Sequence, residues 1–258
     1  MAIVHPTAVV ESGAELADDV TVGPYTIIRS TAKVGAGTRI GPHVVIGAYT
    51  RIGINNVFYQ FSSIGEDPQD KKYGGEATFL EIGDNNTFRE FCTLNRGTAQ
   101  DAGTTRIGSH NWLMAYVHVA HDCQIGNHTI FANNAQLAGH VHVGDFAILG
   151  GFTVVHQFCR IGAHSLTAMG TILLQDLPPF VTASGNPAEV HGINSEGLRR
   201  RQFSADAISA LRRAYKQLYK EGLTLNAARE ELRRTLAPFP ELELLPRFLE
   251  VSGRGIVR

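Results

Sequence analysis

The sequence is poor in cysteine, and its three cysteines are badly placed for cross-linking or for a metal site. Among 258 residues, only Cys92, Cys123 and Cys159 carry thiols. An odd number of cysteines without the close spacing of a zinc site argues against a disulfide framework and is typical of a reducing compartment. We therefore expect neither a metal site nor a redox function from these residues.

Long apolar runs and an excess of charge are also missing. The amino-terminal stretch MAIVHPTAVVESGAEL has neither a cationic start nor a continuous apolar segment, and no other run is long enough to cross a bilayer. We predict a soluble, cytoplasmic protein without a transmembrane segment. The formal net charge of -1 argues against bulk binding of nucleic acid. Residues 190–258, however, hold 13 Lys and Arg against 8 Asp and Glu, so the carboxyl-terminal quarter is basic.

What the sequence has in abundance is a repeat of six residues. Stepping by six from Val4 meets an apolar residue at every position to Ile64, and the column continues from Ile82 to Leu94 and from Ile107 to Ile161. The position two residues earlier is mostly small or β-branched, and all three cysteines occupy it, so we interpret them as small buried residues. This is the hexapeptide pattern of a parallel β-helix, in which three six-residue sides make a coil of eighteen residues.

The repeat breaks twice, and we interpret both breaks as loops that leave the coil. Between Ile64 and Ile82, the polar stretch EDPQDKKYGGEATF predicts an excursion near residues 66–80. Between Leu94 and Ile107 the step is thirteen residues, so RGTAQDAGTT shifts the frame by one and predicts a second excursion near residues 96–105. Loops on a rigid scaffold are favoured places for function.

After about residue 190, the spacing of apolar residues becomes helical. Ser204 is predicted to cap a helix that Gly222 ends, and Thr224 to cap a second helix that reaches Leu236. The stretch PELELLPRFLEV suggests a third helix, interrupted by Pro246. We therefore divide the chain into a β-helix over residues 1–190 and a small helical domain over residues 191–258.

Histidines gather on one part of this scaffold. Val119, Leu137 and Val155 are spaced by eighteen residues and should lie on one side of three successive coils. Four histidines lie within three residues of these positions, namely His118, His121, His140 and His156. Because the coils stack, their imidazoles should lie within about 10 Å of one another. A lone histidine more often has a surface or capping role, but four together indicate a functional site. His142 occupies the opposite position in the alternation of side chains along the strand, so it should point away from the cluster. The other histidines are expected to be structural.

The side of a β-helix is too flat to enclose a small substrate. Hexapeptide proteins commonly solve this problem by forming trimers, so that a cleft lies between neighbouring helices. We therefore expect a homotrimer with three equivalent sites between its subunits.

Beyond the repeat, several segments resemble one family closely. They are IGEDPQDKKYGGE, HVAHDC, LAGHVHV, VVHQFC, GNPAEVHGIN and EGLRRR. Together they are similar to the acyl-carrier-protein-dependent UDP-N-acetylglucosamine O-acyltransferases, which begin lipid A synthesis in bacteria with an outer membrane. The resemblance implies a left-handed β-helix and transfer of a 3-hydroxyacyl group to the glucosamine 3-hydroxyl. The donor would be a phosphopantetheine thioester on acyl carrier protein, with no other cofactor and no metal.

The same resemblance assigns residues to the reaction. Because an alcohol is a poor nucleophile, a base must take its proton, and the family pattern gives this role to His121. Asp122 is the candidate that orients the ring, although adjacent strand residues point to opposite faces, so their pairing requires a corner. The backbone N–H of Gly139 is the candidate donor to the oxyanion. Candidates for binding sugar and acyl groups are Gln69, Asp70, Lys72, His118, His140, His156, Gln157, Asn194, Glu196, Arg200 and Arg201.

Further expectations concern specificity and docking. Met169 stands where the acyl ruler of the family lies, and because methionine fills space that a small residue would leave open, we predict 3-hydroxydecanoyl in preference to 3-hydroxymyristoyl. Arg200 and Arg201 suit a diphosphate, and the basic carboxyl-terminal domain suits an acidic carrier protein. Asn95 stands where some relatives have histidine, and its role is open.

Three alternatives compete with this interpretation. A γ-class carbonic anhydrase shares the scaffold and binds zinc, but the residue five positions after His156, where a third ligand is required, is Ile161. An N-acyltransferase that acts later in the same pathway is nearer, although its relatives carry an extra amino-terminal domain, whereas here the repeat starts at Val4. A non-catalytic β-helix used for binding or assembly would leave the histidine cluster and both excursions unexplained.

Overall fold

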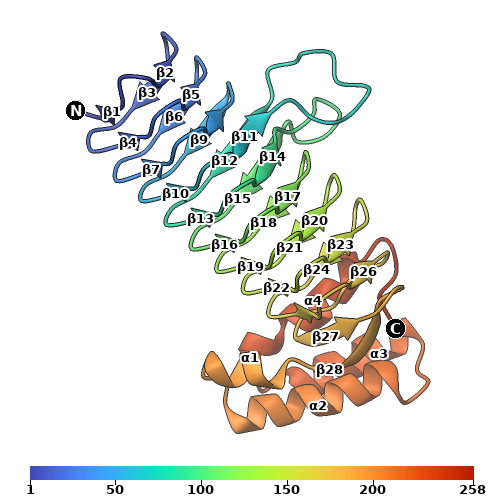
Figure 1. Ribbon diagram of the computed structural model, residues 1–258. Coiled ribbons are helices and arrows are strands. Elements are labelled where there is room, and N and C mark those ends of the chain that lie inside the picture. Colours follow the sequence, from blue (N-terminus) through green and yellow to red (C-terminus); the bar gives the residue numbers. More distant parts are fainter.

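The chain folds as a three-sided coil that ends in a group of helices (Figure 1). The structure is a computed structural model that describes residues 1–258. Successive coils add one short strand to each of three sheets, and neighbouring coils pair in parallel. His118, for example, pairs with Gln136, eighteen residues further along the chain. The predicted six-residue period is therefore confirmed as the period of the structure.

The three sides of the coil are named sheets A, B and C. In spatial order, sheet A contains β1 (Ile3–Val4), β4 (Thr21–Val22), β7 (Arg39–Ile40), β10 (Val57–Phe58), β13 (Thr87–Phe88), β16 (Trp112–Leu113), β19 (Ile130–Phe131), β22 (Ile148–Leu149), β25 (Leu166–Thr167), β27 (Val181–Ser184) and β28 (Glu189–Ile193). Sheet B contains β2 (Val9–Val10), β5 (Ile27–Ile28), β8 (Val45–Ile46), β11 (Ser63–Glu66), β14 (Thr93–Asn95), β17 (His118–Val119), β20 (Gln136–Leu137), β23 (Val154–Val155) and β26 (Ile172–Leu173). Sheet C contains β3 (Glu15–Leu16), β6 (Lys33–Val34), β9 (Thr50–Ile52), β12 (Phe79–Ile82), β15 (Thr104–Ile107), β18 (Gln124–Ile125), β21 (His142–Val143) and β24 (Arg160–Ile161).

The core of the coil is the apolar column predicted from the repeat. Its side chains point inward, and Ile46, Ile64 and Leu94 are fully buried. Burial of each such side chain contributes about 1.5–3 kcal/mol to folding. Cys92 and Cys123 fill the second inward column, where burial raises the pKa of both thiols to about 12. Neutral, buried thiols of this kind are inert fillers, as predicted.

Residues at the three edges of the coil adopt a left-handed backbone that non-glycine residues rarely take. At the edge between sheets B and C, the B/C edge, Asp122 and His140 have φ values of 60° and 62°. At the A/B edge these residues are mainly aromatic, and they include Tyr25, His43, Phe61, Phe91, Tyr116 and Phe152. At the C/A edge they include His110, His128, Phe146, His164 and Phe180. Rings on successive coils stack on one another, so the structural role predicted for these histidines is confirmed.

Two loops interrupt the coil, and both leave it at the B/C edge. The first spans residues 67–78 between β11 and β12, and the second spans residues 96–103 between β14 and β15. Figure 1 shows both loops extending away from the coil on the same side. The repeat alone predicts where the frame breaks, but it does not predict that the two loops share one edge with His121.

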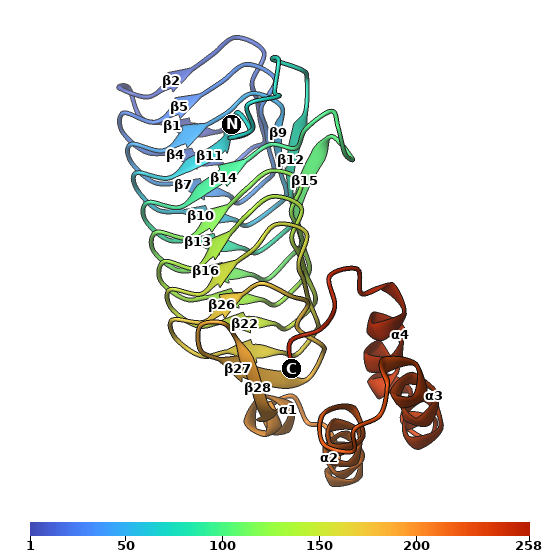
Figure 2. The ribbon, with the colours of Figure 1, turned by 90° about the vertical axis from the view of Figure 1, so that its right-hand side faces the viewer.

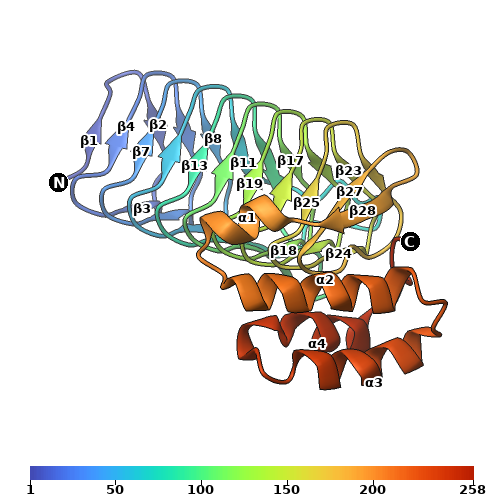
Figure 3. The same ribbon diagram turned by 90° about the horizontal axis from the view of Figure 1, so that it is seen from below.

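The carboxyl-terminal region is helical and has its own apolar core. It contains α1 (Ser195–Arg200), α2 (Ala205–Tyr219), α3 (Leu225–Leu236), the 3-10 turn η1 (Pro240–Leu242) and α4 (Leu244–Val251). Figure 3 shows α2, α3 and α4 grouped on one side of the coil, and Phe248 of α4 packs against Arg160 of sheet C, whose guanidinium carbon lies 6.0 Å from the ring centroid. Beyond α4 the chain returns to the coil, where Ile256 forms a bridge with Asp176 and places the carboxyl terminus against the last turns (Figure 2).

The helix limits test the sequence predictions directly. Ser204 and Thr224 cap α2 and α3 with their side chains, as predicted. The predicted interruption at Pro246 is wrong, because Pro246 is the third residue of α4. The N–H that proline lacks would have no intrahelical acceptor in the first turn, so the helix tolerates it. The antiparallel pairing of β27 with β28 was not predicted, since it lies outside the six-residue period.

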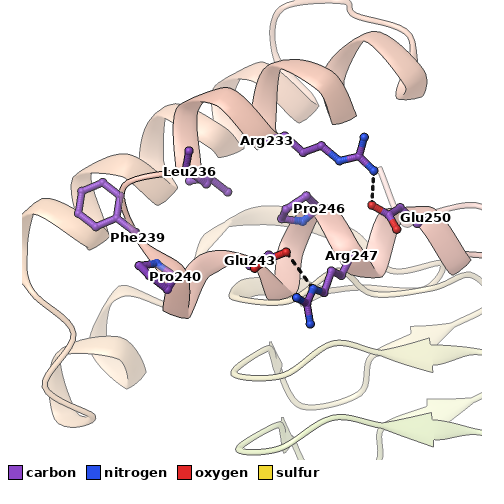
Figure 4. Close-up of a pocket in the computed structure, with 9 residues that line it drawn as sticks. Arg233, Leu236, Phe239, Pro240, Glu243, Pro246, Arg247 and Glu250 are labelled. Carbon is purple, nitrogen blue, oxygen red and sulfur yellow. Dashed lines mark hydrogen bonds and ion pairs between the residues drawn. The ribbon is translucent and has the colours of Figure 1, made fainter.

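A cavity of about 240 Å³ lies between α3 and α4 (Figure 4). Two ion pairs border it, one between Glu243 and Arg247 at 3.0 Å and one between Arg233 and Glu250. Because it lies within the helical region and contains no histidine, it is not the site that the sequence indicates.

The C/A edge provides a prediction about acid stability. His164 stacks between Phe146 and Phe180, and its buried Nδ1 has no hydrogen-bond partner. Burial, followed by the nearby positive charge of Arg201, lowers the pKa of His164 to about 4, and Asp145 opposes this only weakly. Because its ordinary value is about 6.5, His164 contributes full stability above pH 6.5 and loses it as the pH falls through 4.

We therefore expect His164→Phe to preserve the aromatic stack and to reduce the acid sensitivity of the fold. The difference in free energy of unfolding between pH 7.5 and pH 5, measured by urea titration, should be smaller in this variant than in the parent. His43→Phe, at an exposed stacked position, is the matched control and should leave the difference unchanged. An equal acid loss in His164→Phe and the parent would refute the assignment.

Candidate active site

The B/C edge carries His121 and Asp122, the candidate base and the residue expected to orient its ring. His121 follows β17, and Asp122 occupies the left-handed position of the corner. Because the chain turns there, these adjacent side chains lie beside each other and not on opposite faces. His121 Nδ1 and Asp122 Oδ2 are 2.9 Å apart, and His121 Nε2 makes no hydrogen bond within the chain. The corner that the pairing requires is therefore present.

The Asp122 carboxylate is buried and surrounded by donors. The N–H of Thr98 donates to Oδ1 at 2.9 Å, and the hydroxyl of Thr98 donates to Oδ2 at 2.7 Å. The N–H of Asp122 itself donates to Thr105 Oγ1 at 2.7 Å. Burial alone would raise the pKa of Asp122, but the hydrogen bonds from His121 and Thr98 outweigh it and lower that pKa below its usual value. The carboxylate is thus held in its ionised form.

The next coil places Gly139 and His140 against the same pair. The ring of His121 packs on Gly139 so closely that a Cβ there would lie 2.6 Å from His121 Cε1 and would displace the ring. The N–H of Gly139 makes no hydrogen bond within the chain. The ring of His140 meets that of His121 edge to face at 5.0 Å, and its Nδ1 lies 2.6 Å from Asp101 Oδ2. A free imidazole nitrogen and a free backbone donor therefore lie side by side.

Three other candidates lie near this corner but do not bond to the pair. His118, on β17, is half-buried and contacts Thr93 Oγ1 through Nδ1 at 2.7 Å. Burial lowers the pKa of His118, which favours its neutral form. His156 and Gln157 occupy the same edge one coil beyond Gly139, and Gln157 is exposed. His142 lies on sheet C, away from the pair, as predicted.

The first loop carries Gln69, Asp70 and Lys72, none of which contacts His121. The buried Arg96 anchors this loop, because it bonds to the Asp67 carboxylate and to the hydroxyl of Tyr73. A further anchor is Asn95, whose side chain donates to the carbonyl of Asp67 at 2.7 Å. Asn95 therefore holds the loop in this chain, which gives a physical role to a position that the sequence left open.

The remaining candidates lie on the other two edges of the coil. Asn194 is the N-cap of α1, and Glu196 pairs with Arg200 at 3.2 Å on its surface. Arg201 stacks over the ring of Phe146, a residue of the C/A edge, with its guanidinium carbon 4.1 Å from the ring centroid. Met169 stands exposed at the A/B edge. A single chain therefore does not bring these residues to His121.

Four functional neighbours were not predicted from the sequence. They are Thr98 and Thr105, which bond to Asp122, Asp101, which bonds to His140, and Arg96, which anchors the first loop. All belong to the second excursion or its borders, where no period relates a residue to its neighbour in space. Their only sequence signal is that they interrupt the repeat beside the histidine cluster.

His121, Asp122 and His140 could also suggest a metal site, because one ligand atom of each lies within 4.8 Å of the others. Nδ1 of each ring, however, is used by a carboxylate, and Asp122 Oδ2 already accepts from Thr98 and His121. The position at which the carbonic anhydrase pattern requires a third histidine is Ile161, which is buried in the core. These contacts suit proton transfer better than a metal, and the absence of a metal stays a prediction.

A coil of hexapeptide repeats with a histidine–carboxylate pair at one edge is the arrangement of a hexapeptide-repeat transferase. The profile of the bacterial transferase hexapeptide matches residues 13–48 and 104–139. The profile described as Udp N-acetylglucosamine O-acyltransferase, Domain 2, matches residues 176–257. An acyl-(acyl-carrier-protein)–UDP-N-acetylglucosamine O-acyltransferase of Thiobacillus denitrificans is 59% identical over 258 residues, which cover both chains completely.

Solved structures agree with this match. LpxA from Acinetobacter baumannii is 51% identical, with a TM-score of 0.97 over 99% of this chain and 100% of that chain. UDP-N-acetylglucosamine acyltransferase of Francisella novicida is 39% identical, with a TM-score of 0.97 over 99% and 94% of the two chains. The chain belongs to the acyl-(acyl-carrier-protein)–UDP-N-acetylglucosamine O-acyltransferase family.

Family membership settles several of the sequence predictions. The left-handed β-helix with a small helical carboxyl-terminal region is confirmed, and the protein is an acyltransferase. The carbonic anhydrase and the non-catalytic scaffold are thereby excluded. None of the helices is both long and apolar enough to cross a membrane.

Proposed function

We propose that this protein transfers a 3-hydroxydecanoyl group from acyl carrier protein to the glucosamine 3-hydroxyl of UDP-N-acetylglucosamine, the first step of lipid A biosynthesis, in the cytoplasm. The names of the relatives support the carrier protein as donor and the sugar nucleotide as acceptor. The donor is a phosphopantetheine thioester, and the reaction needs no other cofactor. The observation that carries the mechanism is the free Nε2 of His121 beside the free N–H of Gly139.

In this mechanism His121 is the general base. The 3-hydroxyl oxygen attacks the thioester carbonyl carbon while Nε2 accepts the hydroxyl proton. Asp122, ionised and bonded to Nδ1, stabilises the imidazolium that forms. The N–H of Gly139 donates to the oxyanion. When the tetrahedral intermediate collapses, the carbon–sulfur bond breaks and the imidazolium returns the proton to the thiolate of the carrier.

The surface of the coil supports a homotrimer with sites between subunits. Sheet C carries outward ion pairs, such as Lys33 with Glu15 at 2.9 Å, and therefore suits solvent. Sheets A and B instead expose apolar side chains, and Trp112 on sheet A remains 43% exposed. The aromatic ladder of the A/B edge is exposed as well, with Phe152 at 60%. An apolar surface of this extent on two sides of a chain is typical of contacts between subunits.

A trimer also accounts for the distribution of the candidates over three edges. We assign His118, His140, His156 and Gln157 to the sugar and acyl groups beside His121. The loop with Gln69, Asp70 and Lys72, together with Asn194, Glu196, Arg200 and Arg201, would complete the site, with arginines pairing with the diphosphate. The basic helical region would dock the acidic carrier protein.

The test is an acyl-transfer assay with UDP-N-acetylglucosamine and a panel of 3-hydroxyacyl carrier proteins. The sample should first show, by light scattering, three times the 28.0 kDa mass of one chain. We expect release of free carrier thiol with 3-hydroxydecanoyl as the best donor, and an O-acylated product located by NMR at the 3-position. A 3-deoxy acceptor is the control and should give no product. Failure to acylate UDP-N-acetylglucosamine with any donor would overturn the proposal.

A further inference from the structure

We infer that Thr98, in the second loop, is a positioning residue for the catalytic pair and keeps Asp122 ionised and aimed at His121. The inference rests on the proposed role of His121 as general base. Nothing in the motif that carries the two catalytic candidates points to Thr98, which lies twenty-four residues earlier in the chain. Its contacts in the folded protein supply the argument.

Thr98 provides both main-chain and side-chain donors to one carboxylate. Its N–H bonds to Asp122 Oδ1 and its hydroxyl to Asp122 Oδ2. Both residues are 1% exposed, so water cannot replace either donor. A carboxylate buried without donors would take up a proton or turn away from its partner. With Thr98 in place, Oδ2 faces His121 Nδ1, which fixes the tautomer that leaves Nε2 unprotonated.

The backbone of the loop is also organised around this residue. The carbonyl of Thr98 accepts from the N–H groups of Asp101 and Gly103, so the loop closes on it. Gly97 precedes it in a position where a Cβ would lie 2.2 Å from the nitrogen of Thr104, and only glycine fits there. Asp101, which the same turn presents, bonds to His140 Nδ1. One short loop therefore hydrogen-bonds both to the carboxylate of Asp122 and to the imidazole of His140.

The extra length of this coil is consistent with that role. Leu94 pairs with Val119, a separation of 25 residues where most neighbours are 18 apart. The additional residues form the loop, and they occur in the coil immediately before His121. An insertion that served only to connect strands would not need to place a hydroxyl, an amide and a carboxylate on the groups that flank the reacting nitrogen.

The experiment compares Thr98→Val with Thr98→Ser in the full-length protein. Valine keeps the shape and removes the hydroxyl donor, whereas serine keeps the donor. We expect Thr98→Val to lower kcat about ten- to a hundredfold, with little change in either KM. The acid limb of its pH–kcat profile should move to higher pH, because Asp122 loses a donor that favours its ionised form. Thr98→Ser should restore both kcat and the profile.

Thr104→Val is the matched control, because Thr104 is buried at the end of the same loop and its hydroxyl bonds to no group. Its kinetics should equal those of the parent. The inference is overturned if Thr98→Val keeps the parental kcat and pH profile while His121→Ala is inactive. It is also overturned if serine and valine slow the enzyme equally and raise KM, since that pattern reports a distorted fold. A fully active His121→Ala would instead overturn the proposed mechanism itself.

Discussion

Replacing His121 with alanine is expected to lower kcat by about 10²–10⁴-fold, the usual contribution of a general base. The KM values for sugar nucleotide and carrier protein should change little, because the ring acts on the proton of the attacking hydroxyl and the acyl and sugar groups are held elsewhere. The close contact of the ring with Gly139 adds a second expectation. Removal of the ring leaves an imidazole-sized space, so added imidazole should restore part of the activity.

His142→Ala provides the matched control for this variant. His142 lies only two residues from His140, but it stands on β21 of sheet C and bonds to neither His121 nor Asp122. It should retain full activity. Unimpaired transfer by His121→Ala, measured with enzyme whose trimeric mass is unchanged, would remove the base from the mechanism.

The regular part of the fold could be predicted because its physical cause repeats. An inward side chain every six residues specifies the coil, and the count of eighteen brings His121 and His140 together although nineteen residues separate them. The same regularity gives Asp122 its left-handed corner. The sequence showed that pairing of His121 with Asp122 needs a corner, and the structure shows that the repeat places Asp122 at one.

The residues that hold the candidate site in place could not be predicted in the same way. Thr98, Asp101 and Arg96 act from a loop, and the position of a loop residue depends on its own hydrogen bonds and not on a period. At Pro246 a general rule predicted an interruption that does not occur. Proline breaks helices in general, but it is harmless in a first turn. Spacing therefore located the histidine cluster, while the residues that bond to its candidate members became visible only with the fold.

We propose that Met169 sets the length of the acyl chain. It stands at the A/B edge with 78% of its surface exposed, and the equivalent position one coil earlier is Gly151. So large an exposed apolar side chain, on the edge that we assign to subunit contacts, has few neighbours within its own chain. We therefore place it across the acyl groove of the trimer, where its bulk ends the space available to the chain.

Replacing Met169 with glycine is accordingly expected to extend the groove. Four additional methylene groups separate 3-hydroxymyristoyl from 3-hydroxydecanoyl, and at about 0.8 kcal/mol for each buried methylene they amount to about 3 kcal/mol, or roughly a hundredfold in kcat/KM. The ratio of kcat/KM for the longer donor over the shorter one should rise by that factor in Met169→Gly. Met169→Leu, which preserves the volume, should keep the parental preference. Competition assays with both donors measure the ratio directly, and a glycine variant with the parental ratio would show that another residue ends the groove.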